Sequence, residues 1–211
     1  MDWGAMLFLG AYHGINPGMG WLFAVALGMQ QGSARGVWRA LPPIALGHAA
    51  AVGVVVAAAG LARMVVPLDV LKIVVASTLV TLGLYRLRWH RHPRFGGMQV
   101  GFRDLTIWSF LMASAHGAGF MVLPLVIGMT SADLEAAGAG HAHAAHSLGV
   151  GARALWTALG VHTAAYLAVT AVLAWIVYTR VGVAILRTVW FNLDWLWACA
   201  LVIAGAVVLI A

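Results

Sequence analysis

Long apolar segments alternate with short polar ones along the whole chain. Six of these segments are long enough, as α-helices, to cross the roughly 30 Å of hydrocarbon in a bilayer. They lie at about residues 4–30, 42–62, 70–88, 105–130, 154–178 and 190–211. The pattern predicts an all-α integral membrane protein with six transmembrane helices, in a single membrane domain that covers residues 1–211.

The composition agrees with this pattern. Hydrophobic residues make up 63% of the 211 residues and charged residues only 9%, whereas about a quarter of the residues of a typical soluble domain are charged. Six spans leave room only for short loops, so we expect no separate soluble domain. The first segment lacks the basic start of a secretory signal peptide and is too long for one. We therefore expect it to belong to the mature protein.

The positive charges are distributed unevenly between the predicted loops. If the N-terminus lies outside, three basic residues fall on the outer side, namely Arg63, Lys72 and Arg153. Nine fall on the cytoplasmic side: Arg35, Arg39, Arg86, Arg88, Arg91, Arg94, Arg103, Arg180 and Arg187. This is the positive-inside asymmetry. It predicts an inner-membrane protein whose two termini are outside, in the periplasm of a bacterium. The expected partner is the lipid bilayer, including its anionic lipids, and not nucleic acid.

The sequence of the first half returns in the second half. Shifted by 103 residues, "LGAYHG" (9–14) lies over "MASAHG" (112–117), which aligns His13 with His116. Shifted by 114 residues, "GHAAA" lies over "VHTAA", which aligns His48 with His162. The shift grows along the chain, as it does when loops lengthen. We infer two three-helix repeats, at about residues 1–100 and 105–211.

An odd number of spans in each repeat makes the second repeat enter the membrane from the opposite face. The repeats are then inverted, as in many transporters, with equivalent residues around a site at mid-membrane. Here those residues are His13, His48, His116 and His162. A third alignment, at a shift of 122 residues, pairs Gly83 with Gly205, where we expect close helix packing.

The stretch "HGINPGMG" (13–20) interrupts the first apolar segment. Pro17 removes a backbone hydrogen bond and disfavours a helical conformation at Asn16, and Gly18 adds freedom. The carbonyl of His13 is the one that the proline deprives of its usual partner. Since freed carbonyls in a membrane must be satisfied by protein, water or a ligand, we expect a cavity beside His13. A kink filled by helix packing is the alternative.

Ionisable residues inside a membrane are functional candidates by default. Neutral imidazole suits Zn, Cu, Fe, Co and Ni, and four imidazoles predict a site for a transition-metal cation. No carboxylate lies deep in a span, so binding would be weak and exchangeable, with no tightly bound cofactor. Further candidate ligands are Asn16, Met19 and Met121. The alternatives are hydrogen-bonded core histidines and gap-filling core methionines.

Two further features concern metals and thiols. His141, His143 and His146 form a histidine-rich tract between the fourth and fifth spans, on the outer side, and such tracts suggest metal capture. A flexible polar loop is the alternative. Cys199 is the single cysteine, which excludes an internal disulfide and a dithiol relay within the chain.

The quoted stretch resembles the first-helix motif of NicO-type nickel/cobalt transporters, of the LysE-like superfamily, which reads roughly His-Ala-Leu-x-Pro-Gly-His-Gly-Lys. Four positions match, namely His13, Pro17, Gly18 and Gly20. "ALGHAAAV" around His48 resembles the second-helix histidine of the same family. Met19 and Trp21 stand where the family has its second histidine and its lysine. The resemblance implies six spans, inverted three-helix halves and a histidine-rich loop.

Together these features predict a secondary transporter of a transition-metal cation, with nickel and cobalt among the candidate ions. The sequence contains no Walker motif, so coupling to protons is expected rather than ATP hydrolysis. A homo-oligomer or a partner membrane protein is compatible with this prediction. Two alternative functions remain open. One is a membrane redox protein or enzyme that binds metal or haem, and the other is a membrane subunit of a larger complex.

Overall fold

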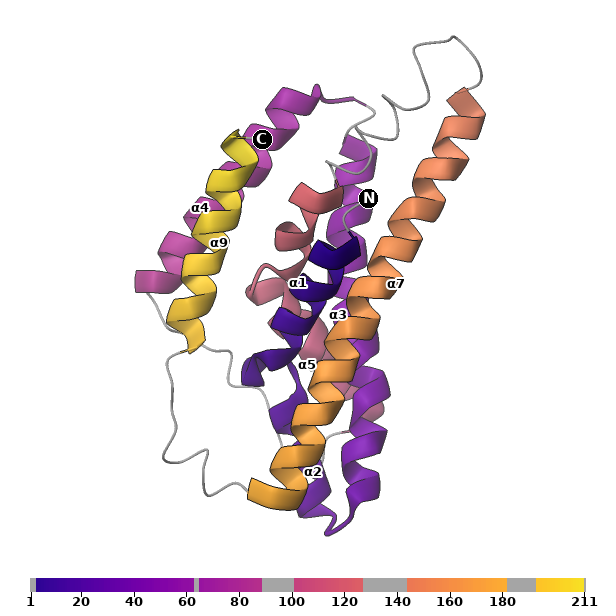
Figure 1. Cartoon of the computed structure of the whole chain (residues 1–211), viewed down its shortest axis with the longest axis vertical. Helices are drawn as coiled ribbons and strands as arrows, with labels where there is room; N and C mark the ends of the chain where they lie inside the picture. The colour runs from indigo at the N-terminus through magenta and orange to yellow at the C-terminus, as the bar shows by residue number, and fades with distance from the viewer. Residues whose placement is uncertain (1–2, 63–64, 89–100, 127–143, 182–192, 211) are drawn as a thin grey trace.

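The computed structural model describes residues 3–62, 65–88, 101–126, 144–181 and 193–210, and every regular element within these ranges is helical. The elements of the first half are α1 (Trp3–Ile15), the 3₁₀ turn η1 (Pro17–Met19), α2 (Trp21–Gln30), α3 (Ala34–Ala62) and α4 (Leu68–Arg88). Those of the second half are α5 (Phe102–Ala115), a short helix Ala118–Val126, α7 (Ala144–Ile176), the π-helical turn η2 (Val177–Val181) and α9 (Leu193–Ile210). The predicted all-α fold is confirmed for these residues (Figure 1).

Several of these helices are long and apolar enough to cross a membrane. Three described segments qualify singly, namely Ala34–Ala62, Asp69–Arg88 and Leu155–Arg180. A fourth span results if α5 and Ala118–Val126, which are bent by 62°, count as one. Two further apolar helices, Trp21–Gln30 and Ala198–Leu209, are shorter. These lengths and compositions indicate a membrane protein.

Two helices differ in detail from the sequence prediction. α3 begins at Ala34 and continues through Pro42 and Pro43, although the predicted span starts only at residue 42. The fourth predicted span is interrupted at His116 and Gly117, and Gly117 adopts a φ of +71°, a conformation that favours glycine. The sequence signal for this second break was the dipeptide "HG", which occurs at 13–14 before the first break and again at 116–117.

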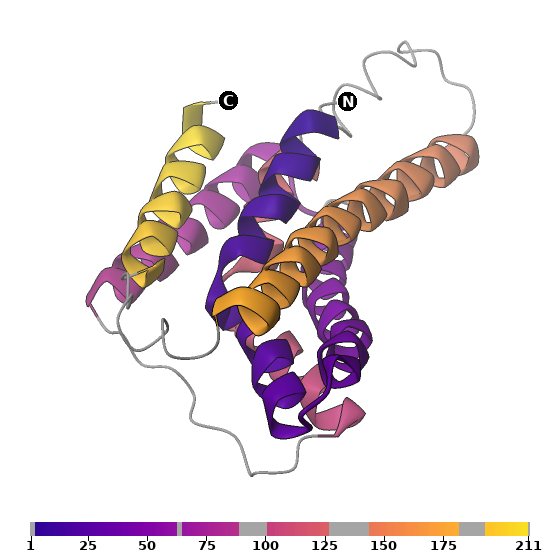
Figure 2. The ribbon, with the colours of Figure 1, turned by 60° about the horizontal axis from the view of Figure 1, so that its bottom comes forward.

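The helices pack mainly as three pairs: α1 with α7, α3 with α5, and α4 with α9. The colours in Figure 1 show α1 running in the opposite direction to α5, and the same holds for α3 with α7 and for α4 with α9. α3 also packs on α7 and joins the first two pairs, while α2 packs on both α3 and α7. Figure 2 shows the α4–α9 pair beside this group of helices.

Small residues allow the helix pairs to approach closely. A Cβ atom on Gly83 of α4 would lie 2.7 Å from Val202 Cγ2 and 2.9 Å from the carbonyl oxygen of Ala198, both on α9. A Cβ atom on Gly205 of α9 would lie 2.8 Å from Val80 Cγ2 and 3.0 Å from the carbonyl oxygen of Ala76, both on α4. The predicted close packing at these two glycines is confirmed.

The α4–α9 pair touches the other helices at the second break. The guanidinium of Arg86 donates a 2.6 Å hydrogen bond from Nη2 to the carbonyl of Ala115, the last residue of α5. A Cβ atom on Gly117 would meet the side chains of Leu82 and Leu201. A cation at the carbonyl end of a helix also suits the helix dipole.

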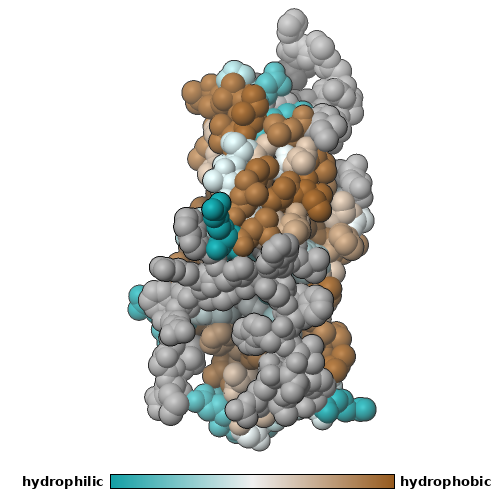
Figure 3. Space-filling model, turned by 90° about the vertical axis from the view of Figure 1, so that its left-hand side faces the viewer, coloured by the Kyte–Doolittle hydropathy of each residue, from teal (hydrophilic) through white to brown (hydrophobic). Residues whose placement is uncertain are grey.

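Large hydrophobic side chains are exposed on the α4–α9 pair. They include Val70, Ile73, Val74 and Leu84 on α4, and Ile203, Val207 and Leu209 on α9. Figure 3 shows hydrophobic residues gathered over the upper part of this side of the molecule. An exposed apolar surface of this extent suits contact with lipid.

We expect Gly83→Ala and Gly205→Ala to destabilise the protein by about 1–3 kcal/mol each, since the added methyl groups force the helices apart. The two losses should be similar because the two contacts are alike. Thermal unfolding of the detergent-solubilised protein measures the effect.

Gly160→Ala in α7 is the matched control, because no atom lies within 4 Å of the Cβ position there. Alanine favours helix over glycine by up to about 1 kcal/mol, so this variant should be no less stable than the wild type. A Gly83→Ala protein as stable as the Gly160→Ala protein would contradict the packing described here.

Candidate histidine site

Four buried histidines come from four different parts of the fold. His13 lies in α1, His48 in α3, His116 directly after α5, and His162 in α7. Each is 1% or less exposed. The predicted candidate ligands are therefore all inside the protein and closed to its surroundings in this conformation.

Three of the four imidazoles form one cluster. The ring centroids of His13 and His162 are 5.0 Å apart, and the ring of His48 lies 5.5 Å from each of them. Nε2 of His48 lies 3.3 Å from Nε2 of His162. When both rings are neutral, one nitrogen donates a proton and the other accepts it.

The tautomers of His13 and His116 are set by backbone carbonyls. Nδ1 of His13 lies 2.7 Å from the carbonyl oxygen of Leu9, and Nδ1 of His116 lies 2.8 Å from that of Met112. A carbonyl only accepts, so Nδ1 carries the proton in each ring. The lone pair of the neutral ring is then on Nε2.

His116 lies at the second helix break, directly after α5. A Cβ atom on Gly18 would be 3.7 Å from both Cε1 and Nε2 of His116, so this edge of the ring faces η1. In the part of the chain that the structure describes, no three side chains among His, Cys, Asp and Glu are arranged to hold a metal ion. The two carboxylates whose side chains are described, Asp69 and Asp104, are exposed.

The backbone between α1 and α2 is ordered by its own hydrogen bonds. Asn16 is extended, and its Oδ1 accepts a 2.9 Å hydrogen bond from the backbone N–H of Gly18. The N–H of Met19 donates to the carbonyl of Asn16 at 2.9 Å. Gly20 then adopts a φ of +143°, which side chains rarely allow, and α2 begins at the next residue.

The expectation that the carbonyl of His13 is open is wrong. This oxygen accepts a 3.3 Å hydrogen bond from the N–H of Asn16, because the chain tightens before Pro17 and brings a nearer donor into reach. Side chains satisfy two other carbonyls of the break. Nε1 of Trp21 donates to the carbonyl of Ile15 at 2.9 Å, and the hydroxyl of Tyr166 donates to the carbonyl of Met19.

The further candidate ligands differ in their surroundings. Met19 and Met121 are members of the buried hydrophobic core, as the core-filling alternative predicts. Asn16 is 5% exposed, and its Nδ2 has no hydrogen-bond partner among the described residues. His141 and His143 lie outside the described residues, and His146 lies in the first turn of α7, where only the backbone is described. The capture tract stays a prediction.

Sequence reasoning missed Tyr166. Its fully buried ring stacks on His48, with centroids 3.8 Å apart and planes inclined by 12°. The available signal was its spacing, because Tyr166 follows His162 by four residues and shares its face of α7.

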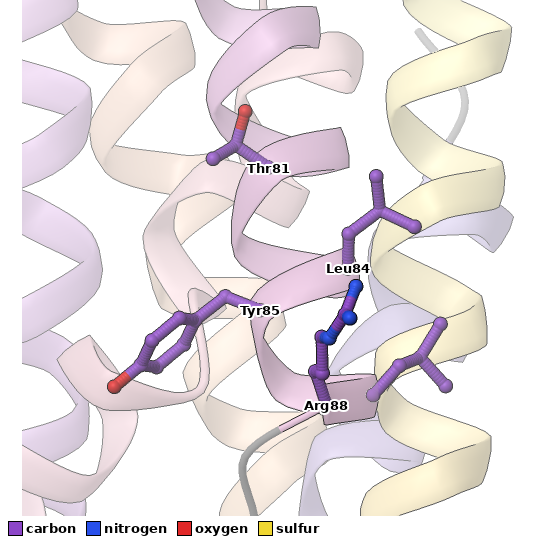
Figure 4. A pocket seen from close by; sticks show the side chains of 5 residues that line it. Thr81, Leu84, Tyr85 and Arg88 are labelled. Carbon is purple, nitrogen blue, oxygen red and sulfur yellow. The ribbon is translucent and has the colours of Figure 1, made fainter.

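A separate groove of about 830 Å³ lies along the last two turns of α4. Its described lining residues are Thr81, Leu84, Tyr85, Leu87 and Arg88, and Figure 4 shows their side chains. None of the four buried histidines lines it. The groove is therefore distinct from the histidine site.

Comparison of the chain with protein-family models, with curated proteins and with solved structures gives no match.

We expect Trp21→Phe to reduce stability, because it leaves the carbonyl of Ile15 without its indole donor while keeping an aromatic ring. A buried polar group left unsatisfied costs about 1–3 kcal/mol. Trp156→Phe is the control, since Trp156 is 69% exposed. Thermal unfolding in detergent should give a lower Tm for Trp21→Phe only; equal Tm values would mean that the indole hydrogen bond does not support the break.

Proposed function

We propose that this protein is a secondary transporter of a transition-metal cation. His13, His48, His116 and His162 would supply its ligands near the middle of the membrane. The observation that carries the proposal is the distance of 3.3 Å between Nε2 of His48 and Nε2 of His162. Two imidazole nitrogens bound at about 2.0–2.1 Å to one tetrahedral ion lie about 3.3–3.4 Å apart.

The surroundings of this pair support a cation site. His13 is the third imidazole of the cluster, and its Nδ1–H is already held by the carbonyl of Leu9. Metal-bound histidines typically donate the second ring N–H in this way, which orients the ring and raises its basicity. His116 has the same arrangement with Met112. Nε2 of His48 and Nε2 of His162 already lie at a distance that suits one ion. His13 or His116 would have to move to complete the coordination, and a site that forms only on loading suits an ion that exchanges.

The packing supports two inverted repeats of three spans. One repeat would contain α1, α3 and α4, and the other their equivalents α5, α7 and α9. If each helix is replaced by its equivalent, the α1–α7 pair becomes the α5–α3 pair, which is also observed. The α4–α9 pair is exchanged with itself. The neighbours of Gly83 are Ala198, Leu201 and Val202, and those of Gly205 are their equivalents at the shift of 122 residues, namely Ala76, Leu79 and Val80.

The histidines at equivalent positions of the two repeats also have equivalent surroundings. His13 and His116 each bind the carbonyl four residues earlier, and each is followed closely by a break in its helix. His48 and His162 meet one another, as residues on a twofold axis do. Such an axis at a central site underlies alternating access, in which one part rocks against the other. The six spans would be α1 with α2, α3, α4, α5 with Ala118–Val126, α7 and α9.

The sequence supports a proposal for the orientation and for the energy source. The positive-inside distribution favours an inner-membrane protein with both termini in the periplasm, and Figure 1 draws the two termini toward the same end of the molecule. The absence of a Walker motif from the sequence favours coupling to an ion gradient, with protons as the natural choice. The resemblance of "HGINPGMG" to NicO-type transporters adds nickel and cobalt as first ions to test.

The test is equilibrium binding of Ni²⁺, Co²⁺, Zn²⁺, Fe²⁺ and Cu⁺ to the purified protein, after elemental analysis of the protein as isolated. We expect exchangeable binding, weakened at least tenfold in His48→Gln and in His162→Gln, the lower end of what loss of a ligand or its support costs. His90→Gln, in the segment between α4 and α5 and outside the described residues, is the control and should bind as the wild type does.

Two other results would contradict the proposal. A stoichiometric metal or haem that survives purification would indicate a redox protein or enzyme. No binding of any ion would make the histidines structural and favour a membrane subunit of a larger complex. Uptake of the bound ion into proteoliposomes, lost in His48→Gln, would complete the evidence for transport.

A further inference from the structure

Tyr166 contacts both the histidine cluster and the helix break. Its ring stacks on His48 at 3.8 Å. Its hydroxyl donates a hydrogen bond to the carbonyl of Met19, the last residue of η1. The same hydroxyl would lie 3.1 Å from a Cβ atom on Gly20. Tyr166 therefore has two contacts with different chemistry, one through the ring and one through the oxygen.

The ring contact orients a candidate ligand. A stacked neighbour inclined by only 12° limits the planes that the His48 imidazole can adopt. In the plane it has, His48 directs Nε2 to His162, which is four residues before Tyr166 on α7. Loss of the ring should therefore weaken the binding of every ion that uses Nε2 of both His48 and His162.

The hydroxyl contact occupies a candidate ligand of another kind. Carbonyl oxygen is a hard donor that suits Mg²⁺, Ca²⁺ and Mn²⁺, whereas imidazole nitrogen suits Zn, Cu, Fe and Ni. Tyr166 connects the carbonyl of Met19, through its hydroxyl, with the ring of His48, on which it stacks. While it accepts the hydrogen bond from Tyr166, it is engaged by a protein donor.

We propose that Tyr166 determines the specificity of the histidine site, because its hydroxyl keeps the Met19 carbonyl from binding the cation. The ion then meets the imidazole nitrogens without this carbonyl oxygen. This inference rests on the proposed function and adds to it a preference for borderline metal ions over harder divalent ions. The repeat-equivalent position is Val52, so only one half of the protein carries this hydroxyl.

The experiment compares Tyr166→Phe and Tyr166→Leu with the wild type by titration of the purified protein with Ni²⁺ and with Mn²⁺. Tyr166→Phe keeps the stacked ring and frees the carbonyl. We expect its affinity for Mn²⁺ relative to Ni²⁺ to rise about tenfold or more, the effect of about 1.4 kcal/mol. Its affinity for Ni²⁺ should stay within a few-fold of the wild-type value.

Tyr166→Leu also lacks the hydroxyl, so it should show the same relaxed ratio, with weaker binding of Ni²⁺ because the stacked ring is gone. It keeps the test decisive if Tyr166→Phe fails to fold. Tyr178→Phe, twelve residues further along the same chain segment in η2, is the matched control and should keep the wild-type ratio.

The outcomes separate the two proposals. If the wild type binds Ni²⁺ and both Tyr166 variants keep its ratio of Mn²⁺ to Ni²⁺ affinity, Tyr166 is only structural and this inference is overturned alone. A loss of thermal stability without a change in ratio has the same meaning. If the wild type binds no transition-metal ion, the proposed function fails first and the inference fails with it.

Discussion

A buried backbone carbonyl needs a hydrogen-bond partner, and this constraint explains most of what the helix break contains. Pro17 ends the regular ladder of α1, so the carbonyls around it need partners from within the protein. Asn16, Trp21 and Tyr166 supply them, from the turn itself, from the start of α2 and from α7. A break that is satisfied in this way can remain inside a membrane.

The same partners fix the surroundings of the histidines. Tyr166 reaches the break because α7 lies along α1, where Gly10 and Gly14 leave space for the backbone carbonyls of His162 and Tyr166. This close approach brings His162 to His13. Ser109 of α5 donates a hydrogen bond to the carbonyl of Ile44, one turn before His48, and so connects the helices of the α3–α5 pair. Close approach of the backbones at Gly10 and Gly14 therefore allows the histidine side chains to cluster.

The α4–α9 pair stands apart in its contacts. Its two helices pack mainly on each other, through the exchanged contacts of Gly83 and Gly205. Two of its links to the rest are at the second break, where Arg86 binds the carbonyl of Ala115 and Gly117 lies against Leu82 and Leu201. The break beside His116 is thus one place where this pair contacts the helices that carry the histidines.

The sequence alone determined the helical class, the apolar segments, the first break, the buried histidines and the close packing at Gly83 and Gly205. These follow from local rules, since hydropathy, proline chemistry and internal alignment need no knowledge of the fold. Only the tertiary structure decided that His13, His48 and His162 cluster while His116 faces Gly18, because that depends on how α1 and α7 pack. It also decided that the carbonyl of His13 is satisfied and that Tyr166 joins the site. Hydrogen bonds between residues 147 positions apart, such as that from Tyr166 to Met19, are set by helix packing and leave no pattern in the chain.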